Sequence, residues 1–328
     1  MQHTSDKIIR PGVEGFMDKN QLSTLVNMSS PEAVYNEVVF IMQLIDPQFS
    51  IAALEEAFGF TQKLYEGKLP GYKGCNTPYH DYRHITDTFL AMARLIHGAQ
   101  LSGEDISERQ MTLGVISALM HDTGMIQKEH DSRGTGAKHT PDHVNLSMDF
   151  MEQHADRLNL TEQEVADLRD MILCTNLMAD ISAIKFSSPQ IELLGKMLAT
   201  ADLIAQMSDR TYLEKLLFLF HEFKEANMGD FKDEVDFLHQ TLNFYEISNQ
   251  RLANTLDNTS RFMIPHFKKR WDIDSNLYIE SLSRQRDYLK KVLADDSKSV
   301  YKELKRDNIV EEVRKKFGKE GVPDPSEK

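Results

Sequence analysis

The chain has 328 residues, 41% of them hydrophobic and 27% charged, which is typical of a globular protein and not of a disordered or fibrous one. Its net charge of −13 would repel a phosphate backbone, which argues against nonspecific nucleic-acid binding. No run approaches the roughly 18 apolar residues of a membrane span, and the first 20 residues lack the apolar stretch of a secretory signal. We therefore expect a cytoplasmic protein with no membrane partner.

Apolar residues recur at spacings of three and four nearly throughout the chain, without a clear run of alternation, and this pattern predicts an all-α fold. Several helix starts are marked by a capping side chain before a proline, as in Ser30-Pro31 and Ser188-Pro189. The predicted helices are, in chain order, 31–45, 51–66, 79–97, 108–121, 141–155, 162–175, 189–208, 212–227, 231–263, 276–294 and 297–317.

Two segments, 67–78 and 122–140, contain several glycines or prolines and resist helix assignment. Long loops inside compact domains are often functional. We predict a flexible N-terminal segment over 1–30, a helical catalytic domain over 31–228 and a C-terminal helical extension over 229–328. The extension has heptad-like apolar spacing, so we expect it to pack against the domain or to form a homodimer.

Histidines and aspartates gather beside the two loop segments. The i, i+4 spacing of His80 and His84 predicts two imidazoles on one helix face. His121 and Asp122 end an almost wholly apolar predicted helix, where an uncompensated carboxylate would be costly. Asp202 follows the apolar stripe of another helix, so it is either paired or metal-bound. Two histidines with an adjacent and a remote aspartate suit a divalent transition metal, and Asp122 could bridge to a second ion.

Each of these residues also has a simpler explanation when taken alone. Asp202 would be explained by a salt bridge to Arg210 or Lys196, and His80 with His84 by a surface pair at a helix start. The combination favours a metal site. Two divalent ions would outweigh the two carboxylates and a bridging hydroxide, leaving an acidic protein with a positive site for a phosphate.

Three segments in this order carry a family resemblance: Pro78-Tyr79-His80-Asp81 through His84, then His121-Asp122, then Asp202. Over about residues 75–228 the chain resembles the HD superfamily of metal-dependent phosphohydrolases. The first segment is similar to the YHNxxxH-type opening of class I cyclic nucleotide phosphodiesterases, with Asp81 in place of the usual asparagine.

The resemblance implies an HD-domain, phosphodiesterase-like helical bundle with an assigned role for each residue. The residues that would hold the first metal ion are His84, His121, Asp122 and Asp202. Asp122 would also reach the second ion, and His80 would protonate the leaving oxygen. Met125 stands where these phosphodiesterases have a further histidine. His143 lies where other HD proteins often place an additional histidine, so it is the candidate ligand of the second metal, with His139 as the weaker alternative.

Together these observations predict a binuclear metal-dependent phosphohydrolase with His80 and Asp122 as catalytic residues. We expect metal-activated hydroxide to attack a phosphate-containing small molecule, a nucleotide or cyclic nucleotide. The cofactors would be two divalent ions, drawn from Fe, Mn, Mg, Zn and Ni. Two alternatives stay open: an HD-fold diiron oxygenase, with which extra ligands such as His143 are compatible, and a non-catalytic HD signalling module that acts through the C-terminal extension.

Overall fold

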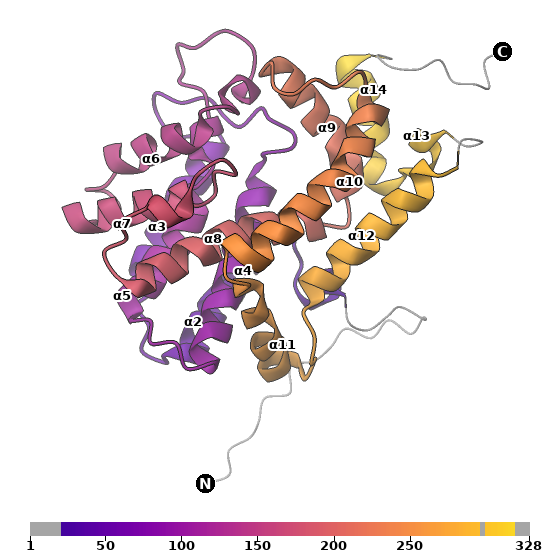
Figure 1. Cartoon of the computed structure of the whole chain (residues 1–328). Coiled ribbons are helices and arrows are strands. Elements are labelled where there is room, and N and C mark those ends of the chain that lie inside the picture. Colours follow the sequence, from indigo (N-terminus) through magenta and orange to yellow (C-terminus); the bar gives the residue numbers. More distant parts are fainter. Residues whose placement is uncertain (1–20, 296–298, 319–328) are drawn as a thin grey trace, which may run out of the picture.

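The computed structural model describes residues 21–295 and 299–318, and these residues form fourteen α-helices and no β-strand (Figure 1). The predicted all-α fold is confirmed. What was predicted for residues 1–20, 296–298 and 319–328, including most of the N-terminal segment, lies outside the described residues. None of the described helices is long and apolar enough to cross a membrane.

The helices are α1 (Leu22–Leu25), α2 (Pro31–Ile45), α3 (Ala52–Tyr65), α4 (Tyr82–Leu101), α5 (Glu108–Met120), α6 (His143–Gln153), α7 (Glu162–Leu173), α8 (Pro189–Ser208), α9 (Tyr212–Glu225), α10 (Glu234–Gln250), α11 (Met263–Trp271), α12 (Leu277–Leu293), α13 (Val300–Glu303) and α14 (Ile309–Phe317). Helices α2 and α8 have the predicted bounds. Their capping serines, Ser30 and Ser188, accept hydrogen bonds from backbone amides of the first turn, which satisfies donors that have no partner within the helix.

Two long predicted helices are broken in the structure. The segment 231–263 is not one helix: α10 ends at Gln250, and a π turn and a 3-10 turn precede α11. In the described part of the segment 297–317, α13 ends at Glu303, before the extended residue Leu304, and two left-handed residues, Asp307 and Asn308, precede α14. Asn and Asp tolerate this conformation better than other non-glycine residues, so they can interrupt a helix while the apolar spacing continues around them. The apolar pattern alone therefore overestimated both lengths.

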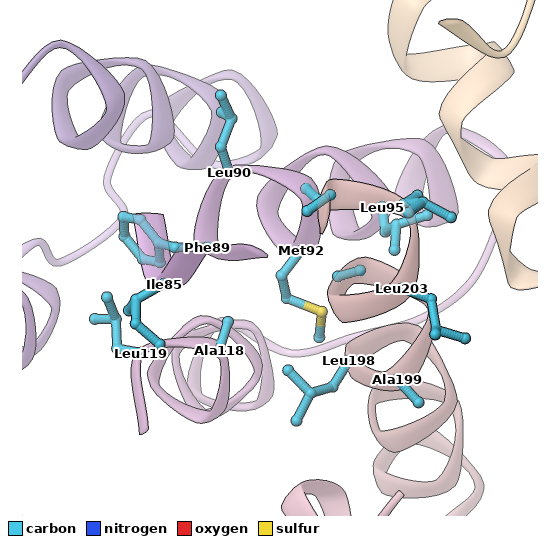
Figure 2. Close-up of a cluster of buried hydrophobic side chains, with 14 of the residues drawn as sticks. Ile85, Phe89, Leu90, Met92, Leu95, Ala118, Leu119, Leu198, Ala199 and Leu203 are labelled. Atoms are coloured by element: carbon cyan, nitrogen blue, oxygen red, sulfur yellow. The ribbon is translucent and has the colours of Figure 1, made fainter. Parts of the chain in front are cut away.

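Helix α4 is the central element of the fold, because all its residues from His84 to Ala99 are buried. It packs against α2, α5, α8 and α11. Figure 2 shows Met92 of α4 and Leu198 of α8 in the hydrophobic cluster between these helices. Helices α11 and α12 of the C-terminal extension pack against α4 and α8 respectively and contribute to the same hydrophobic core. A homodimer through the extension stays a prediction.

Candidate metal centre

Three core helices bring together four side chains of types that commonly bind metal ions. His84 lies in the first turn of α4, His121 and Asp122 directly follow α5, and Asp202 lies in α8. The Nε2 atom of His84 is 3.2 Å from Nε2 of His121, 3.3 Å from Oδ2 of Asp122 and 3.1 Å from Oδ1 of Asp202. The Nε2 atom of His121 is 3.6 Å from each of these two carboxylate oxygens. Residues 37 positions apart, His84 and His121, therefore meet in one buried cluster.

The cluster fits a divalent ion in both distance and chemistry. Around an ion with bonds of about 2.1 Å, neighbouring ligand atoms are about 3.0–3.5 Å apart in octahedral or tetrahedral geometry. The Nδ1–H of His121 donates to the carbonyl oxygen of Ala118 at 2.9 Å, which leaves the Nε2 lone pair for a ligand. The buried group of His84, His121 and Asp122 could therefore hold a metal ion.

The charges of the two aspartates strongly affect the two imidazoles. Burial lowers the pKa of His84, but hydrogen bonding to Asp122 and Asp202 outweighs it and raises that pKa to about 10. Burial also lowers the pKa of His121, but the charge of Asp122 together with the hydrogen bond and charge of Asp202 outweighs it, so this pKa is raised as well. Without a metal ion, the imidazole of His84 therefore keeps its proton at neutral pH.

We expect metal binding to release protons. A divalent ion must displace the proton that the raised pKa keeps on His84, so the apparent affinity for Mn²⁺ should rise with pH. For each proton displaced the rise is about tenfold per pH unit between about pH 6 and 8. Isothermal titration of the chelator-stripped chain in two buffers of different ionisation enthalpy counts these protons. An affinity independent of pH, with no proton release, would contradict the site.

The simple salt-bridge explanation of Asp202 is wrong. The Nζ atom of Lys196 contacts Glu192 at 2.5 Å and Asp257 at 2.6 Å. Arg210 contacts Asp307 at 3.3 Å. Neither cation pairs with Asp202, which contacts the two imidazoles of the cluster instead.

Asp122 lies between this cluster and His143. Its Oδ2 atom lies 3.3 Å from Nε2 of His84 and 3.6 Å from Nε2 of His121, while its Oδ1 atom is 3.5 Å from Nε2 of His143. The Nδ1–H of His143 donates to the carbonyl of Thr140 at 2.6 Å, and burial lowers the pKa of the imidazole. At neutral pH its Nε2 therefore has a free lone pair on the side of Asp122. His139, the weaker candidate, contacts Asp131 at 3.7 Å and does not join the cluster.

Gly124 allows α6 to bring His143 close to Asp122. A Cβ atom at this position would collide with the carbonyl oxygen of His143 and lie 2.7 Å from the backbone nitrogen of Ser147. The Gly124 amide also donates to the hydroxyl of Ser147 at 2.8 Å. The glycine is required here by a close backbone approach, since no larger residue fits without moving α6.

Gly124→Ala should displace α6 and cost about 1–3 kcal/mol of stability through overpacking. Because His143 moves with α6, the variant should also bind less metal. Denaturant unfolding and elemental analysis measure the two effects. Gly59→Ala in α3 is the matched control, because nothing lies within 4 Å of the added Cβ atom. Unchanged stability and metal content in Gly124→Ala would show that α6 does not depend on this contact.

His80 lies beside the cluster but not on the helix that we predicted. Helix α4 begins later, after its N-cap Asp81, whose side chain accepts a hydrogen bond from the amide of His84. The Nδ1–H of His80 donates to Oε2 of Glu222 at 2.7 Å, and the other oxygen of Glu222 accepts the amide of Tyr79 at 2.7 Å. The ring centroids of His80 and His84 are 6.3 Å apart.

Sequence reasoning missed Glu222, which lies in α9 and is buried. Burial lowers the pKa of His80, but the hydrogen bond and the charge of Glu222 outweigh it, so the pKa is raised above its usual value. The signal was available: Glu222 lies between Phe220 and Phe223 in a largely apolar helix, the same pattern that singled out Asp202. A buried acid on an apolar face requires a partner.

Two comparisons with known proteins extend this description. No curated protein matches the chain at a significant level. A family model described as Npun_R2479-like matches residues 68–254, which span more than half of the chain and include every residue of the candidate centre. The chain therefore belongs to the Npun_R2479-like family.

Proposed function

We propose that this chain is a binuclear metal-dependent phosphohydrolase of the HD type, and that it hydrolyses a phosphodiester bond in a nucleotide or cyclic nucleotide. One observation carries the proposal: four donor atoms of His84, His121, Asp122 and Asp202 converge, with the distances given above, and Asp122 directs its second oxygen at His143. A carboxylate between a pair of histidines and a third histidine is suited to holding two ions a short distance apart.

The cluster and the neighbouring pair of His80 and Glu222 would have different roles in the reaction. Divalent ions held there would activate a water molecule and polarise the phosphoryl oxygens of a substrate. Glu222 holds the imidazole of His80 in one orientation through Nδ1 and favours its protonated form. Protonated His80 would then donate its Nε2 proton to the leaving oxygen as a general acid.

The test is a substrate screen on the full chain loaded separately with Mn²⁺, Fe²⁺ and Mg²⁺. A generic aryl phosphodiester comes first, followed by cyclic nucleotides, cyclic dinucleotides and nucleoside monophosphates. We expect metal-dependent hydrolysis that disappears on chelation and returns when metal is added. Two equivalents of bound metal without hydrolysis of any of these substrates would refute the proposal.

His143 is also the reason to keep a second candidate, a diiron oxygenase. An imidazole beside Asp122 adds a nitrogen ligand to the second position, and imidazole suits iron as well as zinc or nickel. Anaerobic spectroscopy of the iron-loaded chain separates the two. A mixed-valent diiron signal with substrate-dependent oxygen uptake supports the oxygenase, whereas hydrolysis with redox-inactive Mg²⁺ supports the hydrolase.

A further inference from the structure

A cavity of about 400 Å³, apart from the metal cluster, contains an unusual concentration of arginine. Its walls come from α1, α4, α12 and the end of α8, and it shares no residue with the metal cluster. Five arginines line it, in a chain whose net charge is −13. They are Arg83, Arg94, Arg210, Arg284 and Arg306. Cavities of roughly 300–1,000 Å³ are the usual size of small-molecule sites.

Arg94 is the most informative of the five. It is only 1% exposed, yet none of the described carboxylates pairs with it. Its Nη1 atom donates to the hydroxyl of Tyr278 at 2.8 Å, while Nε and Nη2 have no hydrogen-bond partner. Its guanidinium also lies 5.5–5.7 Å from the ring centroids of Phe267, Trp271 and Tyr278. Aromatic rings offset only part of the cost of burying a cation with two open donors, so an anion is the expected partner.

The acids near the cavity leave much of its positive charge uncompensated. Arg83 contacts Asp209 at 3.3 Å and Asp87 at 3.9 Å, and the second distance is too long for a hydrogen bond. Burial, helped by the charge of Asp209, raises the pKa of Asp87 to about 8, so this carboxyl is largely uncharged at neutral pH. Among the cavity-lining residues, five guanidinium groups therefore stand against two carboxyl groups, one of which, Asp87, is largely uncharged.

The three remaining arginines have acid partners outside the cavity lining. Their closest carboxylate contacts are 3.3 Å for Arg210, 3.7 Å for Arg284 and 3.9 Å for Arg306. All three arginine side chains are more than a third exposed, so solvent weakens these pairs, although Glu214, the partner of Arg306, is itself only 1% exposed. The cavity thus combines one buried cation with exposed cations at its rim.

We propose that this cavity, defined by Arg94 and the four other arginines, binds a phosphate-bearing small molecule no larger than a nucleoside monophosphate. A guanidinium presents parallel N–H donors that match two oxygens of one phosphate group, and arginine is the residue type best suited to this contact. The buried Arg94 would take the phosphate, while Arg284 and Arg306 close over it from the rim. This site is independent of the proposed hydrolysis, because it uses other residues.

The test is isothermal titration of the full chain, stripped of metal with a chelator and then dialysed so that the metal centre cannot capture phosphate. Inorganic phosphate, pyrophosphate and adenosine monophosphate are the probes, with citrate as the carboxylate comparison. We expect one equivalent of a phosphate probe to bind, more weakly as ionic strength rises. Tighter binding of the nucleotide than of inorganic phosphate identifies the ligand as a nucleotide, and equal binding identifies it as phosphate alone. Tighter binding of citrate, or no binding at millimolar concentration, overturns the proposal.

Variants locate the bound probe. The double variant R284Q/R306Q, at the exposed rim, should weaken binding at least about tenfold, because two charge-assisted contacts are lost. Arg94→Lys retains the charge but loses the forked donors, and it should also weaken binding. Arg169→Gln is the matched control, since this surface arginine contacts Asp149 and Glu152 far from the cavity lining. Equal affinity in the rim variant and the control overturns the assignment even if Arg94→Lys fails to fold.

Discussion

Replacing His121 by alanine should abolish both metal binding and phosphodiester hydrolysis. The side chain is fully buried, and its Nε2 atom lies within 3.6 Å of donor atoms from His84, Asp122 and Asp202. Loss of a residue that only orients a ligand costs roughly 10–100-fold in metal affinity, so loss of a ligand itself should cost more than about 100-fold. Elemental analysis and aryl phosphodiester hydrolysis measure the two losses.

The control is His239→Ala, which removes an exposed histidine from α10 and should keep full metal content and turnover. Circular dichroism should show that the helical content of both variants is unchanged. If His121→Ala binds metal and turns over substrate like the control, the cluster is not the reaction centre and the proposed hydrolase is refuted.

Replacing His80 by asparagine should lower kcat by about 10²–10⁴-fold, the usual contribution of a general acid, while metal content stays the same. The loss should depend on the substrate. An aryl ester has a good leaving group that needs little protonation, whereas a nucleotide ester has a poor one that needs a proton. A merely structural role for His80 would reduce hydrolysis of both substrates equally, so equal losses would contradict the general-acid role.

Glu222→Gln tests the same dyad through its pH dependence. Because Glu222 raises the pKa of His80, the variant should lower that pKa. A general acid must be protonated to act, so activity falls as pH rises through its pKa. Lowering the pKa of His80 should therefore move the alkaline limb of the kcat profile to lower pH. Glu225→Gln, on the same helix but in contact with Thr135, should leave the limb in place. An unmoved limb in Glu222→Gln would separate Glu222 from the acid step.

The sequence predicted the helices best where local signals are strong. The serine-proline starts of α2 and α8 were located correctly, since capping and the restricted backbone of proline act within one turn. The breaks after Gln250 and Glu303 were missed because apolar periodicity continues through them. The start of α4 was placed too early, which put His80 on a helix that begins only after Asp81.

The sequence predicted only in part which residues come together at the site. Spacing and an acid in an apolar context singled out His84, His121 and Asp202, and the fold brings them together. Glu222 and Arg94 were not predicted, because their surroundings cannot be inferred from the neighbouring sequence. Each is a buried charged residue whose partner, or lack of one, depends on helices that pack together from distant parts of the chain. Helix packing is set by many weak contacts that no short motif encodes.

Because the donors of the metal cluster come from α4, the end of α5 and α8, the cluster forms only after the chain has closed two long loops. No fragment that lacks α8 contains the full ligand set, and the unfolded chain holds these groups far apart. A bound ion would therefore favour the assembled core over every partly folded species. Metal supplied during refolding would select completely folded molecules, and its removal would weaken the whole helical assembly at once, because α4 contacts helices from both halves of the chain.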